Sequence, residues 1–143
     1  MRFYRISAIV LAVAFAAVGL VFLLAPGVVS SVFEWMGRWM GIQGMPAGDP
    51  DSGLFRALAV AYMYGVTLLA WMMFRRPTEP MWPALLAQAK LASASVSFLL
   101  FALHEPYLVY AANGVVDGVI GVMVLLLRRQ VMRRGGAATG GAR

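Results

Sequence analysis

Four long apolar runs dominate this chain of 143 residues, at positions 6–25, 54–74, 83–103 and 107–127. A helix rises about 1.5 Å per residue, so each run is long enough to cross a hydrocarbon core about 30 Å thick. Apolar residues make up 62% of the chain and charged residues 13%, whereas soluble domains carry about 25% charged residues. The sequence therefore predicts an all-α fold, an integral membrane four-helix bundle.

The four runs leave little chain for anything else, so we expect one transmembrane domain over residues 1–134. Residues 135–143 are mostly glycine and alanine, which is typical of a flexible tail. For the first run a signal peptide is the alternative, because Arg2 and Arg5 supply a basic leader. The run is longer than such a leader needs, and Pro26 interrupts a cleavage pattern, which favours a membrane span.

Basic residues indicate which side of the membrane each connection occupies. Arginines gather before the first run, between the second and third, and after the fourth, whereas Arg38 alone lies between the first two predicted spans. Cytoplasmic segments carry the excess of arginine and lysine, so we expect an inner-membrane protein with both termini in the cytoplasm. The arginines concerned are Arg2, Arg5, Arg75, Arg76, Arg128, Arg129, Arg133, Arg134 and Arg143.

The connection between the first two runs has a helical pattern of its own. Apolar residues recur at three- and four-residue spacing over positions 28–42, with Trp35 and Trp39 beside them. This pattern predicts an amphipathic helix on the outer membrane surface, in contact with lipid. It is interpreted either as a lipid-anchored connector or as a lid or docking surface for a partner. Its apolar stripe consists of Val29, Val32, Phe33, Met36 and Met40.

Two full charges lie near the middle of neighbouring apolar runs, Lys90 in the third and Asp117 in the fourth. A charge at that depth costs about 3 kcal/mol or more, so it faces a partner or water rather than lipid. The short turn at 104–106 makes the two helices antiparallel neighbours. Counting back from this turn places the two charges about half a helical turn apart along the helix axes, a distance that a lysine side chain spans. We therefore expect a buried ion pair.

Helical spacing places other polar residues on the same faces as the two charges. Ser93 and Ser97 follow Lys90 by three and seven residues, Asn113 precedes Asp117 by four, and Tyr64 lies at a similar depth in the second run. The predicted buried polar core, or ligand site, is Lys90, Asp117, Asn113, Tyr64, Ser93 and Ser97.

Two smaller groups of residues complete the predicted sites. Gly114 and Gly118 form a GxxxG spacing that, with Gly121, lets helix backbones approach closely. At the outer end of the bundle the sequence predicts a polar cluster of Arg56, His104 and Glu105.

The polar core has three possible roles. As a structural ion pair, it fixes the register of the helices. As a polar cavity, it changes protonation, binds an ion or contacts the headgroup of an amphipathic ligand. As an interface, it shares one charge with another membrane subunit.

Catalytic and metal-binding patterns are missing from the sequence. There is no cysteine and one histidine, His104, and there is no phosphate loop, nucleophile elbow or dinucleotide fingerprint. Methionines 36, 40 and 45 are soft copper ligands in principle, but methionine on an apolar stripe is more often packing. We expect no metal, no cofactor and no nucleic-acid partner.

The first run ends in GLVFLLAP at residues 19–26, and Asp117-Gly118 occurs late in the chain. With four spans in a short chain, this pattern resembles small bacterial four-helix membrane proteins of the DoxX-like type, over most of the chain in outline. The resemblance implies a four-helix bundle associated with a redox or stress-related membrane system. It carries over no catalytic residue.

Two functional hypotheses follow. The first is a non-enzymatic accessory or interaction subunit, in a homo-oligomer or with another membrane protein. The second is a small carrier or ligand-binding membrane protein that uses Lys90 and Asp117. A water-accessible pocket at these two side chains would favour the carrier, and a sealed, directly bonded pair would count against it.

Overall fold

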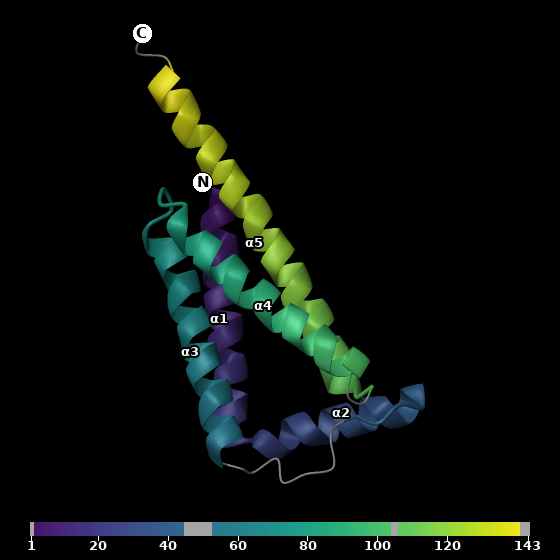
Figure 1. Cartoon of the computed structure of the whole chain (residues 1–143). Coiled ribbons are helices and arrows are strands. Elements are labelled where there is room, and N and C mark those ends of the chain that lie inside the picture. Colours follow the sequence, from purple (N-terminus) through teal and green to yellow (C-terminus); the bar gives the residue numbers. More distant parts are fainter. Residues whose placement is uncertain (1, 45–52, 104–105, 141–143) are drawn as a thin grey trace.

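The computed structural model describes residues 2–44, 53–103 and 106–140. These residues form five helices, α1 (Arg2–Leu24), α2 (Pro26–Met40), α3 (Gly53–Arg75), α4 (Met81–Leu103) and α5 (Leu108–Gly140) (Figure 1). Four of them, α1, α3, α4 and α5, contain stretches long and apolar enough to cross a membrane. The predicted all-α fold with four packed spans is confirmed. By helix length and hydropathy, the chain is a multi-pass membrane protein.

Proline and glycine set the limits of α2, the predicted amphipathic helix. Pro26 occupies its first turn, where the missing backbone N–H is no loss. Gly41 follows the helix with a φ of 69°, a conformation that glycine adopts without strain. The Ile42 N–H then donates to the Gly37 carbonyl at 3.0 Å, which satisfies one carbonyl at the helix end.

α5 extends well past residue 127, where the sequence predicts the end of the last span. Arginine, glutamine and methionine after this point favour helix, and no proline follows. Residues 135–140, predicted as part of a flexible tail, are the last turns of α5. Residues 141–143 lie outside the described residues.

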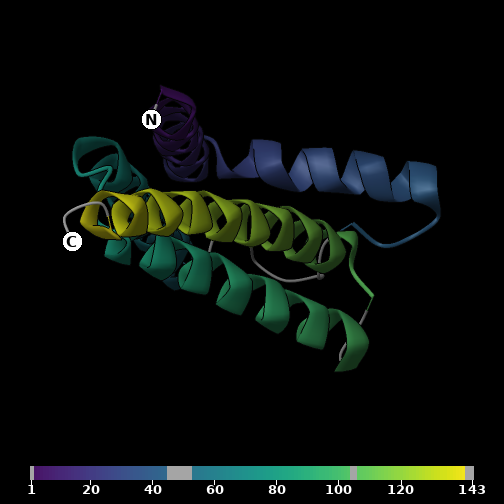
Figure 2. The same cartoon turned by 90° about the horizontal axis from the view of Figure 1, so that it is seen from above.

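The four long helices pack as two pairs, α1 with α3 and α4 with α5. The pairs meet at one end of the bundle, where α1 begins, α3 turns into α4, and α5 runs on past the other helices (Figures 1 and 2). We call this the terminal end. The pairs separate toward the opposite end, where α2 lies across the gap between them. We call this the α2 end.

The apolar core extends from the middle of the bundle toward the terminal end, and all four long helices contribute to it. Small residues such as Ala8, Ala70 and Ala87 are fully buried there, which lets the helices approach closely. Many large apolar side chains face outward along the spans, as expected for helices surrounded by lipid. The core comprises Tyr4, Ala8, Leu11, Ala12, Phe15, Met63, Val66, Ala70, Met73, Leu86, Ala87, Val124, Leu127 and Val131.

The segment after α2 connects that helix to the start of α5. The N–H of Leu108 donates to the Gln43 carbonyl at 2.9 Å, and the N–H of Val109 donates to the Gly44 carbonyl at 3.2 Å. These bonds satisfy amides that the first turn of a helix otherwise leaves free. Because α2 follows α1 directly, it joins the two helix pairs at the end where they separate.

One exposed side of α2 is apolar and aromatic. Val28, Val32, Trp35 and Trp39 share one stripe of the helix and are all exposed. The two tryptophan rings lie 6.2 Å apart. Tryptophan is enriched at membrane interfaces, so this stripe suits the lipid contact that the sequence predicts.

Candidate functional site

A buried ion pair lies at the centre of the bundle. The Lys90 ammonium of α4 donates to Asp117 Oδ1 of α5 at 2.8 Å, and the two side chains are 3% and 5% exposed. The predicted partnership of these charges is confirmed. The short α4–α5 connection makes it possible, because it holds the two helices antiparallel with both residues at similar depth.

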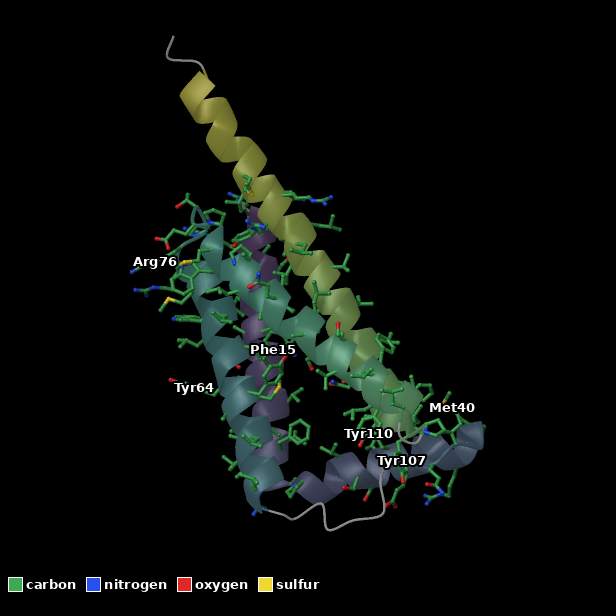
Figure 3. All side chains as sticks on the ribbon, in the orientation of Figure 1. Phe15, Met40, Tyr64, Arg76, Tyr107 and Tyr110 are labelled. Atoms are coloured by element: carbon green, nitrogen blue, oxygen red, sulfur yellow. The ribbon has the colours of Figure 1, made fainter. Side chains whose placement is uncertain are left out.

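Two aromatic rings that the sequence does not single out complete the surroundings of Lys90. Its ammonium lies 4.6 Å from the ring centre of Phe15 on α1 and 4.9 Å from that of Tyr62 on α3. A cation over an aromatic face is stabilised by about 0.5–2 kcal/mol, most strongly away from water. The pair therefore links all four long helices, and Figure 3 shows Phe15 between the two helix pairs.

Tyr64 is not part of this core, contrary to the prediction. Its side chain is 70% exposed and points away from the bundle (Figure 3). Tyr62 takes the place expected for it, and its hydroxyl donates to the Ala89 carbonyl of α4 at 3.2 Å. Residues two positions apart are separated by about 200° around the helix axis, so one tyrosine faces inward and the other outward. Tyr62 shares the face of Val66, Ala70 and Met73, and the structure rather than the sequence shows that this face is buried.

A second polar group extends from the ion pair toward the α2 end. Asn113 of α5 donates through Nδ2 to the Ser97 hydroxyl at 2.8 Å and to the Ser93 hydroxyl at 3.3 Å, both on α4. Ser97 is buried, Ser93 is half-buried and Asn113 is exposed. The structure thus brings five of the six predicted core residues together, in a line from the buried pair to an exposed amide.

One oxygen of the ion pair makes no hydrogen bond to these residues. Asp117 Oδ2 is fully buried and has no hydrogen-bond partner within the described part of the chain. The carboxylate is therefore held through Oδ1 alone by the described side chains. Buried polar atoms of this kind are uncommon in proteins, because losing hydration costs about 1–3 kcal/mol when no bond replaces it.

The three predicted packing glycines differ in how tightly they are enclosed. A Cβ on Gly114 would lie 2.9 Å from the ring of Phe98, and one on Gly121 would lie 2.8 Å from Leu91, both on α4. On Gly118 it would meet the Ala94 Cβ at an ordinary 3.7 Å. Close approach of α4 and α5 thus depends on Gly114 and Gly121 more than on Gly118.

The predicted outer cluster is described only at Arg56. This residue is half-buried near the start of α3, where it lines an open depression of about 480 Å³ with Leu23, Val60 and Tyr64. His104 and Glu105 lie outside the described residues, so the cluster stays a prediction.

The chemistry that the site offers is that of a sealed, directly bonded charge pair. A second open depression, lined by Gly27, Val28, Ser31, Val32 and Trp35, belongs to the surface of α2, and neither depression includes Lys90 or Asp117. Among the described residues, no group of three or more histidine, cysteine, aspartate or glutamate side chains is placed to hold a metal ion.

No protein-family model, curated protein or solved structure matches this chain. What its own geometry establishes is a small all-helical protein with four candidate membrane spans and a buried Lys90–Asp117 ion pair.

Proposed function

We propose that this chain is a non-enzymatic interaction subunit of a membrane assembly, and that its first partner is a second copy of itself. The observation that carries the proposal is Asn113, whose amide is exposed within a candidate membrane span. Polar groups are costly in hydrocarbon, and hydrogen bonds between membrane helices contribute about 0.6–2 kcal/mol. A protein neighbour removes this cost more completely than lipid tails do.

The chemistry of this face suits a second copy. Asn113 carries both an acceptor, its Oδ1, and a donor, its Nδ2, on one exposed side chain. A face that holds both a donor and an acceptor is complementary to itself across a twofold axis. The bonds from Asn113 to Ser97 and Ser93 hold the amide in one orientation, which lowers the entropy lost on association.

The ion pair supports a structural rather than a chemical role for the core. Lys90 and Asp117 are sealed from the surroundings and bond to each other directly. Such a pair fixes the register of α4 against α5, and so positions Asn113 and the two serines.

The absence of cysteine in the chain makes a direct test possible. In the variant Val116→Cys, which keeps Asn113 and lies one turn from it on α5, mild oxidation in native membranes is expected to produce a covalent dimer, because the two thiols lie near the twofold axis. The matched control is Val115→Cys, which lies within about 3 Å of Asn113 along the helix axis but on the opposite face of α5, and which is 55% exposed like Val116. We expect this variant to remain monomeric. Equal crosslinking of both variants, or of neither, would overturn the proposal.

Oligomer mass in a mild detergent gives an independent measurement. The unmodified chain is expected to be a dimer. Asn113→Leu should raise the dissociation constant of the dimer at least tenfold, whereas Asn113→Gln should retain the dimer. An unmodified chain that is monomeric at every concentration contradicts self-association.

The carrier hypothesis has one observation in its favour, the unpartnered Asp117 Oδ2. The sealed geometry of the pair counts against it. A cysteine at position 113 separates the two functions. If the unmodified chain is monomeric and a small water-soluble thiol reagent modifies Asn113→Cys, the result would favour a polar route to the core, and hence the carrier.

Two further parts of the proposal rest on the sequence. The distribution of arginines supports residence in the plasma membrane, with both termini in the cytoplasm. Kinship with DoxX-like proteins is proposed from the residues at 19–26 and the four spans, and it agrees with an accessory role.

A further inference from the structure

We propose that the terminal end of the bundle binds the phosphate group of an anionic phospholipid, with Tyr4 of α1 and Arg128 of α5 as its polar ligands. The inference is independent of the proposed self-association, because it concerns the opposite end of the molecule from Asn113.

Tyr4 supplies the first observation. The residue is 3% exposed, and its buried hydroxyl has no hydrogen-bond partner among the residues that the structure describes. It belongs to the same buried cluster as Leu127 and Val131 of α5. A buried hydroxyl without a partner is destabilising, and an oxygen of a bound ligand would relieve that cost.

Arg128 supplies the second observation, from the neighbouring helix. It follows Leu127 directly and lies at the edge of the α5 face formed by Val124, Leu127 and Val131. Its Nε is buried and has no partner in the described part of the chain. Guanidinium donors match the oxygens of a phosphate group in geometry as well as in charge. Figures 1 and 2 both show the start of α1 beside this part of α5.

The charge balance of the terminal end points to an anion. Six arginines with described side chains lie there, whereas the described carboxylate at this end, Glu79, already bonds to Arg76 and Trp82. The first turn of α1 contains no acidic residue, so its free amides add to the positive potential. The six are Arg2, Arg5, Arg75, Arg76, Arg128 and Arg129.

Depth identifies the anion as a lipid headgroup. Tyr4 lies in the first turn of α1, and Arg128 lies in the last turns of the α5 candidate span, which ends at Met132. Both residues are therefore near the boundary of the spans, where lipid phosphates lie. A basic residue near an anionic membrane surface contributes about 1 kcal/mol, or about fivefold in affinity.

The test is native mass spectrometry of the full chain released from detergent and titrated with phosphatidylglycerol or with neutral phosphatidylcholine. We expect phosphatidylglycerol to bind at least fivefold more tightly. Arg128→Gln should weaken that binding about fivefold and Tyr4→Phe about threefold. Arg129→Gln removes an equal charge from an exposed neighbour and should change it less than twofold. Arg128→Lys retains the charge without Nε, and should lose part of the affinity.

Several results would overturn the inference. Equal losses of affinity for Arg128→Gln and Arg129→Gln would show that the lipid is held by general electrostatic attraction to the surface. Unchanged binding in both Tyr4→Phe and Arg128→Lys would show that Tyr4 and Arg128 are not ligands of the phosphate. Displacement of phosphatidylglycerol by millimolar inorganic phosphate, but not by sulfate, would assign the site to a free anion instead. Circular dichroism of each variant checks that the helices are intact.

Discussion

At the scale of single residues, Lys90 and Asp117 stabilise the bundle only as a pair. Moving either charge into an apolar interior is costly, and their direct bond and the two aromatic rings offset that cost. Removing one partner leaves the other charged and buried, whereas removing both leaves no unpaired buried charge.

We predict a strong coupling between the two positions. Lys90→Met and Asp117→Asn are each expected to lower stability by about 3–5 kcal/mol, and the double variant by clearly less than the sum of the two. Thermal unfolding of the four proteins in one detergent measures this coupling. The matched control is Arg76→Gln, which breaks the exposed Arg76–Glu79 pair and should cost about 0.5 kcal/mol or less. Additive losses at positions 90 and 117 would contradict the coupling.

The pairing of these charges could be predicted from the sequence, but the role of Tyr62 could not. Lys90 and Asp117 are unusual in their surroundings, and a short turn fixes their relative depth. Tyr62 and Tyr64 occur in a helix that is apolar on every side, because a span meets lipid on one face and protein on the other. Apolar periodicity therefore does not reveal the buried face, and only the packing of α3 against α1 and α4 distinguishes the two tyrosines.

At the scale of the elements, α2 is the connection between the two helix pairs. Its end packs tightly against the segment that follows, and a Cβ on Gly44 would collide with backbone atoms of Phe33 and Glu34. Backbone atoms cannot move aside as a flexible side chain can. The two bonds from Leu108 and Val109 thus depend on glycine at this position.

This dependence predicts a local effect of Gly44→Ala. The substitution should displace residues 42–44 and expose the amides of Leu108 and Val109, because their acceptors move with the segment. Hydrogen exchange at these two amides is expected to accelerate about five- to tenfold, with little change in the core of α4. Gly27→Ala is the matched control at the other end of α2, where an added Cβ meets nothing within 4 Å. Unchanged exchange in Gly44→Ala would show that α5 does not need this connection.

Helix existence and approximate limits follow from the sequence, because long apolar runs and prolines mark them. The pairing of α1 with α3 does not, since a long connection permits several arrangements. The bonds from residues 43 and 44 to α5 also join segments far apart in the chain, and no local pattern encodes them.

At the scale of the whole molecule, we predict that the four candidate spans place both termini on the same side of the membrane, and α2 on the other. The terminal end carries six arginines whose side chains are described, whereas Arg38 and Arg56 are the arginines described at the α2 end. The excess of arginine on the cytoplasmic side then predicts a cytoplasmic terminal end. The α2 stripe with Trp35 and Trp39 would accordingly contact the outer leaflet.

Labelling of single cysteines tests this orientation, because the natural chain has none that would react. Thr78→Cys reports on the α3–α4 turn and Glu34→Cys on the polar side of α2; both positions are exposed and outside the spans. In intact cells, a maleimide that cannot cross membranes should modify Glu34→Cys and spare Thr78→Cys. After the membrane is opened, both should react to a similar extent, which confirms that each thiol is accessible. The reverse pattern in intact cells would invert the topology, and labelling of both would contradict four complete spans.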